Sequence, residues 1–242
     1  GQRNSGEITL NGPAARKVHR GDIVIIISYG ILDFEAAKSF KPTLVFPNEK
    51  VNLHIFEPRY KKLIRHCEEK SENFGIIPYI KGKIIDAGTE LELLSIYNLK
   101  IDGSCDVELL GKRVFHVVDF NYPNKQDDYL NGKIEFLPNI PTSELQFQTL
   151  LLSKLNQLFD LLEIKKQLPV DPEELFSFDF AHYVGLSIHQ ELELIQIPVE
   201  NERLKYLVKH LNFFIPHVLE VNNIKERARL NGHIKYLKPP TF

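Results

Sequence analysis

The most restrictive feature of this sequence is a change of pattern near residue 140, where strand-like segments give way to helix-like ones. Ahead of the change, Asp102-Gly103 is a hairpin signal, and Asn131-Gly132 predicts another turn. Four segments have the apolar and β-branched content of strands: Phe74–Tyr79, Glu90–Leu99, Cys105–Leu110 and Lys112–Phe120. The sequence therefore predicts a block rich in antiparallel strands.

One helix is predicted ahead of these strands and a helical bundle after them. Glu57-Pro58 favours a helix start, because proline is tolerated in the first turn. Beyond a linker at Pro138–Pro141, Ser143 and Gln146 have the spacing of a capping box. Apolar spacing then predicts a bundle of roughly four to five helices. Further segments begin near Asp171, Ser187 and Asn201, and the last should break or kink at Pro216.

The first 43 residues form a third region, rich in strand signals. Glu7–Leu10 predicts a short strand that ends at the turn dipeptide Asn11-Gly12. The aliphatic run Ile23–Ile27 predicts a strand buried on both faces, since exposure would invite edge aggregation.

Composition limits the functional classes. The net charge of the 242 residues is -2, which argues against a broad nucleic-acid-binding surface. No apolar run approaches the length of a membrane-spanning helix. Cys67 and Cys105 give neither a disulfide framework nor a C-x-x-C site, and no secretory signal pattern opens the sequence. We therefore expect a cytoplasmic protein that contacts neither nucleic acid nor membrane.

The sequence from about Leu44 to Lys238 resembles the LON substrate-binding domain family. Val45-Phe-Pro-Asn-Glu49 followed by Leu53-His-Ile-Phe-Glu-Pro-Arg-Tyr60 resembles the family's opening signature, and Phe74-Gly75-Ile76 and Arg229-Leu-Asn-Gly-His233 fit later parts. The resemblance implies a PUA-like β barrel, a helical bundle and recognition of polypeptide. It covers only the recognition part of a Lon protease, and the chain contains no phosphate-binding loop.

The sequence from about Ser5 to Phe46 resembles the carboxy-terminal part of aspartate 1-decarboxylase. Ser5-Gly-Glu-Ile-Thr-Leu-Asn-Gly-Pro-Ala-Ala-Arg16 carries this likeness, with Gly21-Asp-Ile-Val-Ile-Ile-Ile-Ser-Tyr29. It implies part of a double-psi barrel whose substrate-site loop corresponds to Asn11, Gly12, Ala14 and Ala15. That family uses a pyruvoyl group made by cleavage of a Gly-Ser bond, and its amino-terminal half is absent here. Gly103-Ser104 has the same two residues, but its place favours a hairpin turn.

Other polar and aromatic groups allow two readings each. Glu57, Arg59 and Tyr60 could form a recognition surface, or a helix start in which Arg59 pairs with a carboxylate. The histidines, of which His54, His66 next to Cys67, and His182 with His189 are the nearest groups, lack the spacing of a helical zinc site, so we expect no metal. A set of phenylalanines could line a groove but favours a bundle core: Phe176, Phe178, Phe180, Phe213 and Phe214.

These observations predict an α+β chain in three parts. Residues 1–43 are a decarboxylase-like fragment, 44–138 a LON-like β-rich domain and 139–242 a LON-like helical bundle. The predicted function is non-catalytic recognition of polypeptide or a protein partner, with no cofactor and with oligomerisation possible through the amino-terminal fragment. The alternative is an incomplete pyruvoyl-dependent decarboxylase that converts aspartate to β-alanine. A joining error in the gene sequence is a third reading.

Overall fold

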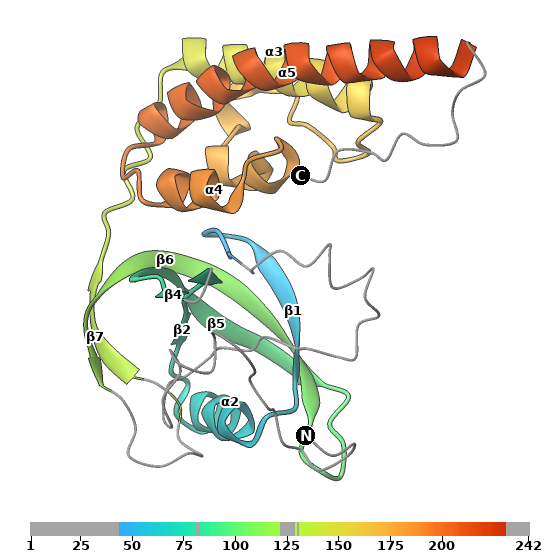
Figure 1. Ribbon diagram of the computed structural model, residues 1–242. Coiled ribbons are helices and arrows are strands. Elements are labelled where there is room, and N and C mark those ends of the chain that lie inside the picture. Colours follow the sequence, from blue (N-terminus) through green and yellow to red (C-terminus); the bar gives the residue numbers. More distant parts are fainter. Residues whose placement is uncertain (1–43, 81–82, 122–128, 130, 231–242) are drawn as a thin grey trace. The chain divides into compact units, whose positions relative to one another are not determined.

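A computed structural model describes residues 44–80, 83–121, 129 and 131–230, and Figure 1 shows its elements. Contacts between Cα atoms divide the chain into two compact units. The described part of the first lies between residues 50 and 136, and we call it the β unit. The described part of the second comprises residues 44–49 and 137–230, and we call it the helical unit. The three domains predicted from the sequence, 1–43, 44–138 and 139–242, remain a prediction.

The β unit contains an antiparallel sheet in the order β1-β6-β5-β2, with β7 also paired to β6, and a separate ribbon of β3 and β4. The strands are β1 (Lys50–Ile55), β2 (Phe74–Ile76), β3 (Tyr79–Ile80), β4 (Lys83–Ile84), β5 (Ala87–Tyr97), β6 (Cys105–Asn121) and β7 (Asn131–Phe136). The predicted block of antiparallel strands is therefore present.

Strand β6 organises this sheet, and its length was not predicted. Cys105–Leu110 and Lys112–Phe120 were expected as separate strands, but Gly111 continues the ladder by pairing with Leu91. Strand β1 pairs with β6 as far as Leu110, and β7 pairs with it from Phe115 onward. A strand rather than a break forms at Gly111 because β5 pairs with it there and β1 and β7 hold β6 on either side.

Two turn predictions had different outcomes. Asp102-Gly103 lies in the predicted hairpin between β5 and β6, where Gly103 has a φ of 79°. The turn predicted at Asn131-Gly132 is wrong, because both residues lie in β7. Gly132 suits that strand, since a Cβ there would lie 2.4 Å from the carbonyl oxygen of Asp119 on β6.

Helix α2 (Pro58–Lys70) is the predicted helix, and it begins with proline in its first turn. It buries Ile64 and Cys67 and ends at Ser71, which adopts a left-handed conformation with a φ of 54°. These two side chains therefore face the interior of the β unit.

The helical unit contains three α-helices and two 3-10 segments. They are α3 (Leu145–Leu162), η2 (Pro172–Glu174), η3 (Ser177–Tyr183), α4 (Ile188–Ile195) and α5 (Glu200–Leu230). Helices α3 and α5 run alongside each other (Figure 1). None of the described helices is both long enough and apolar enough to cross a membrane.

The helix signals were only partly right. Ser187 and Gln190 form a complete capping box ahead of α4. The capping box predicted at Ser143 is wrong, because Glu144 is the N-cap of α3 and no side chain caps it. Asp171 caps a segment as expected, but the segment is one 3-10 turn. Helix α5 continues through Pro216 to Leu230, so the proline does not break it.

A buried charged network holds the start of α5. Arg203, only 3% exposed, lies 2.7 Å from Glu200, and Glu200 accepts a 2.8 Å hydrogen bond from the Ser177 hydroxyl. Arg203 also donates to Asn139 and to the carbonyl oxygen of Ile197. Because each buried charge has partners, the network avoids the cost of an unpaired buried ion.

Residues 44–49 pack within the helical unit. Val45 and Phe46 are fully buried, and the Phe46 ring stacks 5.2 Å from that of Phe178. His182 bridges Glu49 at 3.2 Å and Glu191 at 3.0 Å. Burial lowers the pKa of His182, but hydrogen bonds to Glu191 and Glu49 outweigh it and raise the pKa from 6.5 to about 9. His182 is therefore a cation at neutral pH.

This cation should make stability depend on pH. Because the folded pKa lies above the unfolded value, its contribution is complete below pH 6.5 and is lost as the pH rises to about 9. A third of the side chain is exposed, so we expect a loss of about 1–2 kcal/mol in the free energy of unfolding. Urea unfolding at several pH values would measure it.

The His182→Gln variant should lack this alkaline decline, whereas the exposed His189 replaced by Gln should keep it. Equal pH profiles for the original chain and His182→Gln would contradict the assignment.

Candidate functional site

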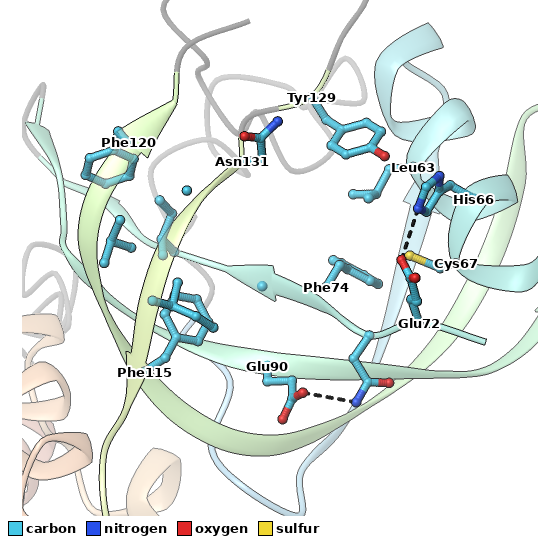
Figure 2. A pocket seen from close by; sticks show the side chains of 16 residues that line it. Leu63, His66, Cys67, Glu72, Phe74, Glu90, Phe115, Phe120, Tyr129 and Asn131 are labelled. Carbon is cyan, nitrogen blue, oxygen red and sulfur yellow. Dashed lines mark hydrogen bonds and ion pairs between the residues drawn. The ribbon is translucent and has the colours of Figure 1, made fainter. Parts of the chain in front are cut away.

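The β unit contains a pocket of about 320 Å³ between α2, β2, β5, β6 and β7. Its apolar walls carry three phenylalanines, Phe74, Phe115 and Phe120, and Tyr129 stands at its border (Figure 2). The remaining lining residues are Leu63, His66, Cys67, Glu72, Asn73, Gly75, Ile77, Glu90, Val117, Asn131, Gly132 and Ile134. A mostly apolar concavity with a few polar groups is the usual form of a binding site.

Alternation along the strands aims these side chains inward. Phe115, Val117 and Ile134 come from β6 and β7, and Val117 pairs directly with Ile134. The Phe115 ring covers Gly75 so closely that a Cβ at Gly75 would lie 2.6 Å from the ring. The glycine therefore sets how deeply the ring can sit and fixes one wall of the pocket.

Two hydrogen-bonded pairs supply the polar groups, and Figure 2 shows both as dashed lines. His66 lies 3.1 Å from Glu72, and the Asn73 amide donates to Glu90 at 3.2 Å. The Arg113 guanidinium donates two hydrogen bonds, of 2.6 and 2.9 Å, to the carboxylate of Glu90. The hydrogen bond from Arg113 is the main reason that the pKa of Glu90 lies below its usual value.

Cys67 is the only cysteine among the residues that line this pocket, and its environment does not activate it. Burial, together with the charge of Glu72, raises the pKa of its thiol to about 11. A thiol protonated at neutral pH is a poor nucleophile. The pocket thus offers shape, apolar surface and hydrogen bonds, which serve binding.

The predicted recognition residues Glu57, Arg59 and Tyr60 lie together at the start of α2. Arg59 donates to Glu57 at 2.9 Å, and its guanidinium lies 4.9 Å from the centre of the Tyr60 ring. The side chains of Glu57 and Arg59 are each less than one-fifth exposed. A helix start in which Arg59 pairs with a carboxylate was one of the two interpretations of these residues. Their role in recognition, the other interpretation, stays a prediction. Asn11, Gly12, Ala14 and Ala15 lie outside the described residues, as does Ile23–Ile27.

Gly103-Ser104 lies in a hairpin turn, as its place in the sequence favoured. Ser104 is 3% exposed, and its hydroxyl donates to Asp102 at 2.7 Å. The adjacent backbone bond from Lys100 to the Ser104 carbonyl, 2.8 Å long, closes the same turn. These bonds give the pair a structural role in the β5–β6 connection.

Three of the histidines considered as metal ligands bond to carboxylates instead. His54 bonds Asp106 at 2.6 Å, and His66 and His182 have the glutamate partners given above. Within the described part of the chain, no group of three or more His, Cys, Asp or Glu residues could hold a metal ion.

The phenylalanines of the helical unit divide between interior and surface. Phe180 is 4% exposed, whereas Phe176 is 45% and Phe213 is 74% exposed. Phe178 lies between Phe46 and the guanidinium of Arg203, which is 4.3 Å from its ring centre. The set is therefore neither one continuous groove nor wholly a core.

Comparison with known proteins connects most of the chain to one family. Residues 39–212 match the "ATP-dependent protease La (LON) substrate-binding domain", and residues 1–54 match "Aspartate decarboxylase". In the solved structures, a Lon N-terminal domain protein from Xanthomonas campestris matches with a TM-score of 0.55 and 21% identity, covering 70% of this chain and 94% of its own. The N-terminal domain of Mycobacterium avium complex Lon protease gives 0.51 and 17%, with coverages of 71% and 94%. The TM-scores show a shared fold, and with identities below 25% the likeness extends no further.

The amino-terminal match is short and close. Aspartate 1-decarboxylase from Flavobacterium psychrophilum is 77% identical over 52 residues, which are 22% of this chain and 45% of that enzyme. The enzyme from Christiangramia forsetii is 68% identical over 53 residues, 22% and 46% of the two chains. The chain therefore spans less than half the length of the curated relatives it matches.

Replacing Gly75 should distort the pocket. In Gly75→Ala the added methyl meets the Phe115 ring, so we expect the free energy of unfolding to fall by roughly 1–3 kcal/mol. In a chain that already carries Phe115→Leu, the ring is absent and Gly75→Ala should cost less than it does in the original chain. A double-mutant cycle from urea unfolding would measure the difference between the two costs. Strictly additive losses would show that the two positions do not interact.

Proposed function

The chain belongs to the LON substrate-binding domain family, and we propose that it recognises polypeptide through the pocket between α2 and β7 without cleaving it. The observation that supports this most directly is the apolar lining of that pocket, where Phe74 and Phe120 are only partly covered. An unfolded segment exposes apolar side chains, and burying one of them in this pocket would remove apolar surface from water.

The exposed strand β7 favours a polypeptide over a small compact ligand. All six of its residues are exposed, and Asn131, Gly132 and Ile134 belong to the pocket border. Among the described residues, β6 is the only strand paired with β7. An extended segment could therefore add main-chain hydrogen bonds beside a pocket that takes a side chain.

The finer features of this function form part of the same proposal. We propose a PUA-like arrangement for residues 44–138, a bundle for 139–242 and a double-psi origin for 1–43. A cytoplasmic location, function without a cofactor and association through the amino-terminal fragment belong to it as well. Membership of a family whose description is substrate binding supports the central element, which is recognition of polypeptide.

A second candidate is decarboxylation with a complementing chain, favoured by the 77% identity of the amino-terminal match. Two contacts of this fold weigh against it. The decarboxylase match runs to residue 54, but Val45 and Phe46 are buried in the helical unit and Lys50–Ile55 pairs with β6. Those residues would have to leave both places to complete another barrel.

Coexpression with the amino-terminal half of the Flavobacterium psychrophilum enzyme would test the second candidate. We expect no pyruvoyl-bearing fragment by mass spectrometry and no release of β-alanine from aspartate. Detection of both would establish the lyase instead.

Binding should depend on the pocket. With a fluorescent, permanently unfolded model polypeptide, Ile134→Asn should weaken binding by about fivefold or more, since it removes apolar surface at the pocket. Val118→Asn is the matched control, because Val118 is 59% exposed on β6 and lies outside the pocket lining.

Fluorescence anisotropy would measure both dissociation constants. Binding no stronger than that of an unrelated globular protein would refute the proposal, as would equal losses in the two variants.

A further inference from the structure

A second hollow of about 350 Å³ adjoins the apolar pocket in the β unit. Its lining residues are Cys67, Glu68, Ser71, Glu72, Asn73, Glu92, Leu93, Leu94, Ser95 and Ile96. Cys67, Glu72 and Asn73 line both hollows, so the two meet around the end of α2. A ligand seated in the apolar pocket would therefore have the second hollow beside it.

The two hollows differ in chemistry but share one sign of charge. The residues that line them include four glutamates and no lysine or arginine: Glu68, Glu72, Glu90 and Glu92. Arg113 pairs with Glu90, and Lys112 lies 2.9 Å from Glu92. The two remaining glutamates, Glu68 and Glu72, have no lysine or arginine partner among the described residues, and both lie at the end of α2.

Two carboxylates stand at that end. Glu72 faces His66, whereas Glu68 is exposed and has no ion-pair partner among the described residues. Both are within reach of the last turn of α2, where Ser71 caps the helix by bonding the Cys67 carbonyl oxygen. A helix carries partial negative charge at its carboxy-terminal end, so the helix and Glu68 both favour a cation there.

We propose that the polypeptide bound here pairs a bulky apolar residue with a lysine or arginine close to it in sequence. The apolar side chain occupies the pocket lined by Phe74, Phe115 and Phe120, and the cation occupies the second hollow beside Glu68. An acidic segment is disfavoured, because no lysine or arginine lines either hollow, and the one histidine there, His66, already pairs with Glu72. This inference rests on the proposed function and adds the class of segment that the site selects.

Three fluorescent peptides would test the selection. They share one apolar anchor and differ only in a flanking position that is Lys, Gln or Glu, with that position moved along the peptide in separate sets. We expect affinity to fall in the order Lys, Gln, Glu, by about two- to fivefold per step, the size of an exposed ion pair. The differences should shrink as salt rises from 0.05 to about 0.5 M, because salt screens exposed charges.

A pair of neighbouring variants separates a local effect from net charge. Glu68→Gln should lose the preference for the Lys peptide, whereas Glu69→Gln, an exposed change of equal charge outside both hollows, should keep it. Equal affinities for the three peptides, or equal losses in both variants, would overturn the inference and leave the proposed function standing. Failure to bind any of the peptides would overturn both.

Discussion

The architecture of the β unit depends on the hydrogen bonding of one strand, β6. A strand has two edges, and β5 occupies one of them along most of β6. Because β6 is 17 residues long, its other edge has room for β1 and then β7 in succession. The pocket exists because β7 joins the sheet beyond the end of β1 and brings Ile134 opposite Val117, close to α2 and β2. A β6 of average length, about five or six residues, would leave no place for β7.

The helical unit relies on a different constraint, the satisfaction of buried charge. Glu200 and Arg203 are almost fully inaccessible, and Ser177 and Asn139 complete their hydrogen bonds. An apolar pair of the same volume could stabilise the unit as well. The ionic network instead fixes the stretches around Asn139 and Ser177 in one arrangement relative to the start of α5. Backbone hydrogen bonds between strands thus fix the arrangement of the β unit, whereas a network of buried charged side chains fixes that of the helical unit.

Local signals in the sequence predicted most of the elements. Glu57-Pro58, Asp102-Gly103 and the helix start at Ser187 depend on a few neighbouring residues, and each lies where expected. The errors arose where distant partners decide: Gly111 stays in a strand because β1, β5 and β7 hold the chain around it, and Asn131-Gly132 is drawn into β7 by β6. The pocket was missed for the same reason. No spacing in the sequence links Leu63, Phe120 and Tyr129, although Phe74-Gly75-Ile76 was among the segments that fit the family.

The packing of residues 44–49 within the helical unit has a consequence for how the protein is made. The bridge from His182 to Glu49 spans 133 positions, with the whole β unit between them. At a synthesis rate of about 5–20 residues per second, Phe46 is added to the chain roughly 7 to 26 seconds before Phe178. The strands of the β unit pair with one another, so this unit can fold within that interval, whereas the helical unit must await the synthesis of α5. The order of translation therefore makes the β unit an early-folding insert, and closing the long loop around it is among the last steps.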